Sequence, residues 1–255
     1  MKLADLVAYV NDLLQTATVP DYGNALNGLQ LENYSGDVSK IAAAVDAHLP
    51  VVKMAAQRGC DLLLVHHGIF WSGLQPLVGP HYQKLRVCGE NDLAIYSAHL
   101  PLDGHLELGN GIQLARALEL PGVEWTSFFP FKGFPVGVRG EVAAGVSRED
   151  LSTRLEKALG GKAHLCPGGP EEIRQIGIVT GGAGDAVATM KEQGIDTFIT
   201  GEGPHWSYTL AEELGVNVYY GGHYATETFG VKALAAHLST KFGLPWEFID
   251  HPTGL

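Results

Sequence analysis

Short aliphatic runs alternate with amphipathic segments along most of the first half of the chain. A run that is apolar at nearly every position is typical of a strand buried on both faces of a parallel sheet. The segments between these runs carry apolar residues at helical spacing, and the first of them ends at Gly59. The pattern predicts strands at 41–45, 62–65 and 93–98, and helices at 50–58, 81–90 and 111–120. Alternation of this kind indicates an α/β fold with helices on the faces of the sheet.

The same order of elements returns later in the chain. Residues 121–135 are rich in Pro, Gly and Phe and predict a break. An ungapped overlay of residues 41–68 on 176–203 then matches strand, helix and strand, and pairs Asp61 with Asp196. We therefore expect two related α/β lobes with largely parallel sheets, a pseudo-duplication. Their predicted limits are residues 1–124 and 125–255, the second lobe including a short α+β excursion at 128–170.

Composition narrows the classes of function. The chain has 255 residues and a formal net charge of −11, which argues against binding to a nucleic-acid backbone. Three cysteines, far apart in the sequence, indicate free thiols in a reducing cytoplasm. No run of eighteen apolar residues predicts a membrane span, and the amphipathic segment 1–17 is typical of a surface helix.

Ligand-type side chains follow three predicted strands: those at 62–65 and 93–98, and a further strand predicted at 216–220. The first strand end carries two adjacent histidines, and the other two carry a His-x-x-x-Asp/Glu spacing; the residues are His66 and His67, His99 and Asp103, and His223 and Glu227. Ligands of open α/β sheets bind outside the carboxyl ends of the strands. For an isolated His-His pair, one buried and one exposed structural histidine would be the simpler interpretation. Imidazoles and carboxylates at three strand ends instead suggest two divalent ions such as Zn²⁺, Mn²⁺ or Fe²⁺.

Five ordered segments resemble one known family. They are 27–30, 65–68, 98–103, 199–202 and 222–227, with the sequences NGLQ, VHHG, AHLPLD, ITGE and GHYATE. They are similar to the signature segments of the Nif-three-like family, whose members are often named GTP cyclohydrolase type 2 homologues and which is also called domain of unknown function 34. The resemblance covers essentially the whole chain. It implies two α/β lobes, a ring-shaped homohexamer with a central cavity, and a dinuclear metal site in the cleft between the lobes.

The resemblance also implies the roles of the ligands. His66, Asp103 and Glu227 bind one ion, and His67, His223 and Glu227 bind the other, so that Glu227 bridges the two. His99 is then a further ligand or a group that orients one. Two departures from the family stand out: residues 100–102 read Leu-Pro-Leu where many members have a threonine and an asparagine, and residues 128–170 are too few for the domain that some members insert there.

These features favour a metal-dependent hydrolase acting on a nucleotide-like or phosphate-containing small molecule. Two ions lower the pKa of a bound water towards ~7 and hold an oxygen of the substrate. Glu202 and His205, at a strand end and a helix start of the second lobe, are candidates for acid–base catalysis, and a structural role for them is about equally expected. A non-catalytic metal-binding ring that serves as a scaffold, metal store or regulatory partner is the alternative. Binding of nucleic acid through the ring is disfavoured by the negative charge.

Overall fold

The computed structural model describes residues 1–255 and has a mixed α/β fold with two sheets. One compact unit consists of Met1–Leu102 and Gly230–His251, and the other of Asp103–Phe229 and Pro252–Leu255. The boundary falls inside helix α9 (His223–Phe242). Each unit therefore contains residues from both predicted lobes, 1–124 and 125–255.

The first unit is built on a five-stranded sheet in the order β1-β4-β3-β2-β11. Its strands are β1 (Gly28–Leu31), β2 (Ile41–Asp46), β3 (Leu62–His67), β4 (Ala94–Ser97) and β11 (Trp246–Phe248). All neighbours run parallel except β1, which pairs antiparallel with β4. The prediction of a largely parallel sheet is therefore confirmed for this unit. All six residues of β3 are buried, as the continuous apolar run indicated.

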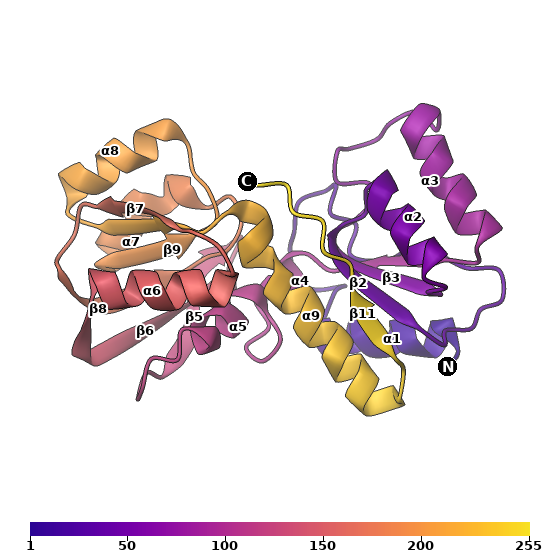
Figure 1. Cartoon of the computed structure of the whole chain (residues 1–255), viewed down its shortest axis with the longest axis horizontal. Helices are drawn as coiled ribbons and strands as arrows, with labels where there is room; N and C mark the ends of the chain where they lie inside the picture. Colours follow the sequence, from indigo (N-terminus) through magenta and orange to yellow (C-terminus); the bar gives the residue numbers. More distant parts are fainter. The chain divides into compact units, whose positions relative to one another are not determined.

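Helices cover both faces of this sheet (Figure 1). They are α1 (Leu3–Leu14), α2 (Leu49–Gln57), α3 (Gly79–Glu90) and α4 (Leu100–Asp103), which ends at the first residue of the other unit. α2 and α3 pack through Val52 and Cys88 against one face, and α1 lies on the other. Gly59 follows α2 with φ +66°, a left-handed conformation that glycine adopts without strain, and so lets the chain turn back into β3.

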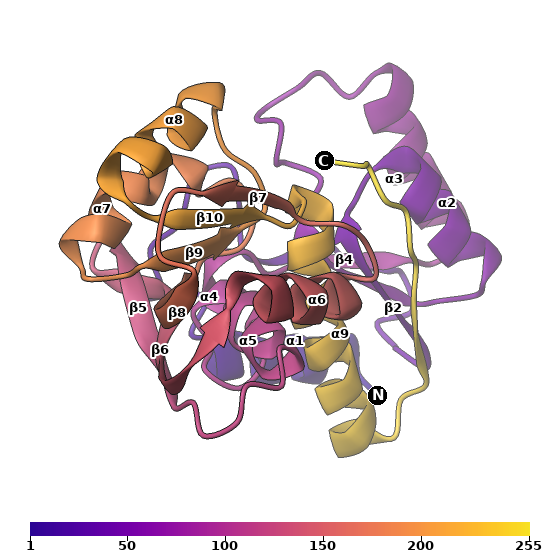
Figure 2. The same ribbon diagram turned by 60° about the vertical axis from the view of Figure 1, so that its left-hand side comes forward.

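The second unit has a six-stranded mixed sheet in the order β5-β6-β8-β9-β10-β7 (Figure 2). Its strands are β5 (Trp125–Phe131), β6 (Phe134–Ser147), β7 (His164–Pro167), β8 (Glu172–Ile178), β9 (Thr197–Thr200) and β10 (Asn217–Tyr220). Only β8, β9 and β10 run parallel to one another. The β5–β6 connection is a two-residue turn at Lys132 and Gly133, both with positive φ, and so short a turn can only join antiparallel strands.

Four helices and a 3₁₀ turn complete the second unit. They are α5 (Asn110–Ala117), α6 (Arg148–Leu159), η1 (Gly184–Ala186), α7 (Val187–Glu192) and α8 (His205–Leu214). α5 and α6 bury Leu114 and Leu155 against one face of the sheet. The run β8–α7–β9–α8–β10 repeats the order of β2–α2–β3–α3–β4 in the first unit. None of the helices combines the length and apolar character that a membrane span requires.

Candidate metal centre

Three histidines of the first unit converge at the carboxyl ends of β3 and β4. His66 and His67 are the last two residues of β3, and His99 follows β4. The ring of His66 lies with its centroid 4.9 Å from that of His67 and 4.7 Å from that of His99. All three residues are buried, and one ring nitrogen of each lies within 4.8 Å of those of the other two. These distances allow the three imidazoles to hold one metal ion.

The Nδ1 atom of each of these rings is hydrogen-bonded to an oxygen. His66 Nδ1 donates to the carbonyl oxygen of Ala98, His67 Nδ1 to Asp46 Oδ1 and His99 Nδ1 to Asp21 Oδ1, each at 2.9 Å. A carbonyl or carboxylate oxygen can only accept, so the proton of a neutral ring resides on Nδ1 and the lone pair on Nε2. This tautomer is the one that histidine ligands of metals adopt when a second group orients them. The donor set therefore fits a divalent cation of the zinc, manganese or iron type.

Asp21 holds His99 and the chain around it. Its carboxylate also accepts from the amide of Asn27 at 2.8 Å and from the backbone N–H of Leu100 at 3.0 Å. Asn27 Oδ1 in turn accepts from the backbone N–H of His99 at 2.7 Å. Burial raises the pKa of Asp21, but the hydrogen bonds that its carboxylate accepts, first of all that from His99, outweigh burial and lower it. The polar segment around Asp21 therefore fixes a candidate ligand.

Trp71 forms an aromatic wall beside two of the histidines. Its ring lies 4.5 Å from that of His67 at an interplanar angle of 27°, and 4.4 Å from that of His99. Trp71 is half-buried, and an apolar ring at this place limits the access of water to the histidines.

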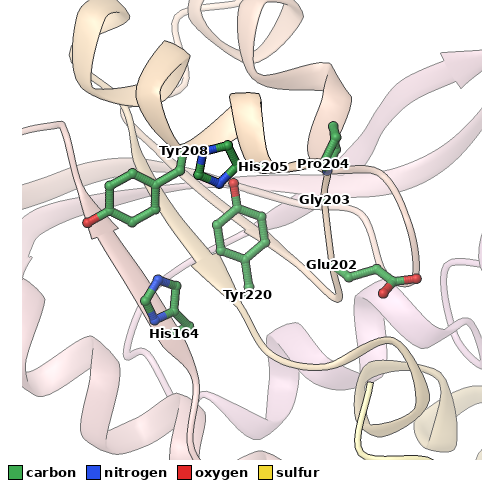
Figure 3. Close-up of a pocket in the computed structure, with 7 residues that line it drawn as sticks. All are labelled: His164, Glu202, Gly203, Pro204, His205, Tyr208 and Tyr220. Atoms are coloured by element: carbon green, nitrogen blue, oxygen red, sulfur yellow. The ribbon is translucent and has the colours of Figure 1, made fainter.

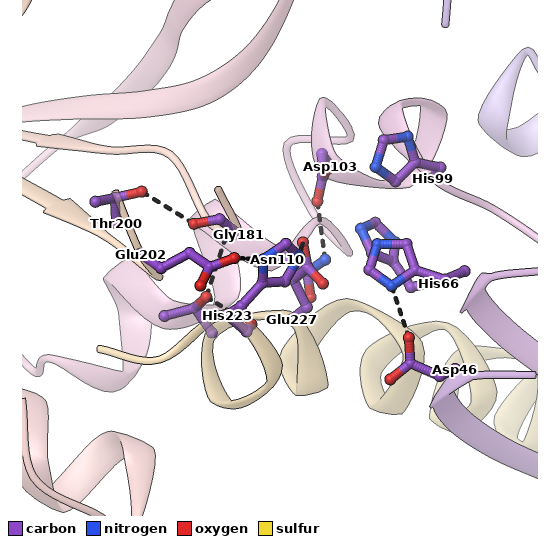
Figure 4. A network of polar contacts seen from close by, with 12 residues as sticks. Asp46, His66, His99, Asp103, Asn110, Gly181, Thr200, Glu202, His223 and Glu227 are labelled. Carbon is purple, nitrogen blue, oxygen red and sulfur yellow. Dashed lines mark hydrogen bonds and ion pairs between the residues drawn. The ribbon is translucent and has the colours of Figure 1, made fainter. Parts of the chain in front are cut away.

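The second unit contributes a histidine held by two carboxylates. His223, the first residue of α9, donates from Nδ1 to Glu202 Oε1 at 2.8 Å, and its Nε2 lies 3.2 Å from Glu227 Oε1 (Figure 4). Glu227 is one helical turn further along α9, and its side chain is buried. Burial lowers the pKa of His223, but the hydrogen bonds and charges of Glu227 and Glu202 outweigh burial and raise it to about 9.

A glycine turn packs tightly against this pair. Gly181 has φ +67°, and a Cβ added there would lie 2.3 Å from Glu227 Oε1 and 3.4 Å from His223 Nε2. Only glycine fits this position without moving the carboxylate. The turn after β8 therefore shapes the surroundings of Glu227.

The other predicted site residues lie as follows. Asp103, the last residue of α4, is buried, and its Oδ1 accepts from Asn110 Nδ2 at 2.8 Å (Figure 4). The segment that carries it is a short helix of four residues. Glu202 contacts His223 directly, whereas His205 is exposed at the start of α8. Glu202 therefore orients a candidate ligand in this structure.

Sequence reasoning missed the two aspartates that orient His67 and His99. Asp46 is the last residue of β2 and lies opposite His67 in the strand register, so the rule that placed ligands at strand ends could have found it. Asp21 belongs to no strand or helix and lies 78 residues before His99, and no local pattern marks it.

Comparisons with known proteins place the chain among relatives of the same length. The family model described as DUF34/NIF3 (NGG1p interacting factor 3) matches residues 1–253. A Deinococcus radiodurans protein named "GTP cyclohydrolase 1 type 2 homolog" is 40% identical over 251 residues, which cover 98% of this chain and 94% of that protein. A Pyrococcus abyssi protein of the same name is 38% identical over 256 residues, which cover 100% of this chain and 100% of that protein.

Solved structures show the same fold. The protein TTHA1606 from Thermus thermophilus matches with a TM-score of 0.88 and 38% identity over 100% of both chains. Reduced HcgD from Methanocaldococcus jannaschii matches with a TM-score of 0.83 and 25% identity over 98% of both chains.

Proposed function

The chain belongs to the DUF34/NIF3 family, and from this membership and its donor set we propose that it binds two divalent metal ions and hydrolyses a small molecule. One observation carries the proposal. In each of His66, His67, His99 and His223, Nδ1 is hydrogen-bonded to an oxygen, which orients Nε2 for a ligand. Histidine ligands of metal ions almost always share this arrangement, because the hydrogen bond at one ring nitrogen orients the other toward the metal.

The proposed ligand assignment follows the family resemblance. His66, Asp103 and Glu227 bind one ion, and His67, His223 and Glu227 bind the other. The buried Glu227 would suit a position shared by both ions, because a carboxylate has two oxygens and can offer one to each ion. His99 completes the histidine cluster as a further ligand or an orienting group. The metal is zinc, manganese or iron, since imidazole and carboxylate suit all three.

The chemistry of such a centre is hydrolytic. When bound, two divalent ions would supply a water nucleophile at neutral pH and a positive charge that polarises the substrate. In this chain, Asp21 and Asp46 hold the rings of His99 and His67, Glu202 holds His223, and Trp71 limits solvent access. His205, which lies near Glu202 in the chain and is exposed, remains our candidate for moving a proton.

The substrate class rests on the relatives. Several carry the name "GTP cyclohydrolase 1 type 2 homolog", which supports a nucleotide-like or phosphate-containing small molecule. We also propose assembly as a ring-shaped homohexamer. Light scattering after size exclusion tests this point, with an expected mass of six times the 27.2 kDa chain. A monomer or dimer at micromolar concentration would contradict it.

Elemental mass spectrometry of the purified protein tests the metal centre. We expect about two ions per chain. Glu227→Ala should lose most of both, because both ions share this carboxylate. Glu213→Ala, which removes an exposed glutamate of the same unit, is the matched control and should retain them.

The outcomes separate the candidate functions. Absence of metal even after reconstitution at neutral pH removes the basis of the proposal. Two tightly bound ions without hydrolysis of nucleotides or phosphoesters would instead favour the non-catalytic ring, as a scaffold, metal store or regulatory partner.

A further inference from the structure

A cavity of about 510 Å³ in the second unit is walled by aromatic and imidazole rings. Tyr208 projects from α8, Tyr220 ends β10, His164 begins β7 and His205 begins α8 (Figure 3). Cavities of ~300–1,000 Å³ are the usual size for small-molecule ligands. The space is thus large enough for a ligand of one fused ring system with a substituent.

The rings are arranged for stacking. The ring of His164 lies 5.7 Å from that of Tyr208 at 35°, and 6.3 Å from that of Tyr220 at 27°. The rings of His164 and Tyr220 are thus close to parallel, and the ring of Tyr208 is tilted from that of His164. A flat ligand ring can stack on such faces, because ring-to-ring stacking has little dependence on the identity of the ligand's substituents.

Hydrogen bonds fix one wall in place. Ser207 Oγ donates to the carbonyl oxygen of Pro204 at 2.6 Å and accepts from the Tyr220 hydroxyl at 2.7 Å. Burial raises the pKa of Tyr220, so its hydroxyl is neutral and a donor at neutral pH. The Tyr220 ring is therefore held before any ligand arrives, which reduces the entropy lost on binding.

The cavity also adjoins the candidate metal ligands of the same unit. Glu202 lines its margin and accepts from His223 Nδ1 at 2.8 Å. The lining includes no lysine or arginine, so the walls offer nothing that would pair with a phosphate. Its polar side-chain atoms are the carboxylate of Glu202, the hydroxyls of the two tyrosines and the ring nitrogens of the two histidines.

We propose that this cavity binds the planar heteroaromatic ring of a small molecule, with Tyr208, Tyr220 and His164 as its stacking surfaces. This inference rests on the proposed function in one respect: it takes the bound ring to be part of the substrate. The bound ring lies against Glu202, so the rest of the molecule extends towards the His223–Glu227 pair. Ring binding itself needs no metal.

Calorimetric titration with three probes tests the proposal: guanosine, adenosine and ribose 5-phosphate, which has no aromatic ring. We expect both nucleosides to bind the untreated and the EDTA-stripped protein, and ribose 5-phosphate not to bind the stripped protein. Tyr208→Leu should weaken nucleoside binding about 5- to 150-fold, the loss expected from one stacking contact. Tyr34→Leu, which changes a fully exposed tyrosine of the other unit, should leave it unchanged.

The exposed His164 offers a second variant that carries little risk of unfolding. His164→Ala should also weaken nucleoside binding if its ring stacks. Nucleosides that fail to bind at millimolar concentration, or that bind both variants as tightly as the unchanged protein, overturn the proposal. Metal analysis of the same samples separates the two ideas: nucleoside binding by a protein that takes up no metal overturns the proposed function and supports the ring cavity.

Discussion

Asp21→Asn should strongly destabilise the first unit, although it changes one atom of the side chain. The side chain of Asp21 is 7% exposed, and its two oxygens accept four hydrogen bonds. Oδ1 accepts from the backbone N–H of Tyr22 and from Nδ1 of His99. Oδ2 accepts from the side-chain amide of Asn27 and from the backbone N–H of Leu100. An asparagine has one acceptor oxygen, so its NH₂ group must face two donors whichever way it turns.

The size of the effect follows from these contacts. A hydrogen bond to a charged group contributes ~1.5–3 kcal/mol net, so losing two lowers the free energy of unfolding by about 3–6 kcal/mol. Domains are stable by only ~5–15 kcal/mol, so the change is large. Rearrangement of the loop around residue 21 would reduce this loss of unfolding free energy towards the lower end of the range.

Urea denaturation of EDTA-treated protein at pH 7 measures the effect without any contribution from metal. Asp37→Asn is the control, because it removes an exposed carboxylate paired with Lys2 and should cost less than ~1 kcal/mol. A loss below ~1 kcal/mol in Asp21→Asn would refute the assigned hydrogen bonds.

The difference in unfolding free energy between the unchanged protein and Asp21→Asn should depend on pH, because the Asp21 carboxylate titrates. The pKa of Asp21 is lowered in the folded state from 3.8, so the stability that its charge contributes is complete above that value and is lost as the pH falls through the folded pKa. The gap in unfolding free energy between the two proteins should therefore narrow in acid. A gap that stays constant down to the lowest pH at which both fold would contradict this account.

Two further results follow from the structure. Burial raises the pKa of Cys60 and of Cys88 to about 11. Both thiols should therefore resist thiol reagents at neutral pH until the chain unfolds. Rapid labelling of either thiol under native conditions would contradict this. Gly181→Ala should lower the free energy of unfolding more than Gly194→Ala does. Both glycines have positive φ, but only at Gly181 would an added Cβ meet the Glu227 carboxylate. Equal unfolding free energies of the two variants, measured in urea, would show that the carboxylate moves aside freely.

The parallel part of each sheet could be predicted because its strands are short and buried on both faces. Continuous apolar runs marked β2, β3 and β4 to within a residue or two. β5 was missed, because residues 121–135 contain the Pro and Gly that usually mark a break. β5 is an edge strand, where Pro130 is tolerated since one side of the strand pairs with nothing. The pairing of β11 with β2 joins segments about 200 residues apart, for which the local pattern holds no information.

The candidate ligands could be predicted for the same reason as the strands. His66, His67 and His99 stand where apolar runs stop, and a strand end is a place that sequence can locate. Their orienting partners follow a different rule, since any oxygen near Nδ1 suffices. For His66 that oxygen belongs to the backbone of Ala98, which no choice of side chain reveals.

These orienting groups give a physical argument for a cation in the centre. Asp21, Asp46 and Glu202 each place a carboxylate against an imidazole Nδ1. When the imidazoles are neutral, as metal ligands must be, they do not balance these charges. Charge removed from water is costly unless it is paired, and the largely buried Asp21 is the strongest case. A divalent cation on the Nε2 side of the rings would offset this negative charge and would itself be bound more tightly because of it. The arrangement that orients the histidines thus also favours positive charge, which either a bound cation or a protonated ring supplies.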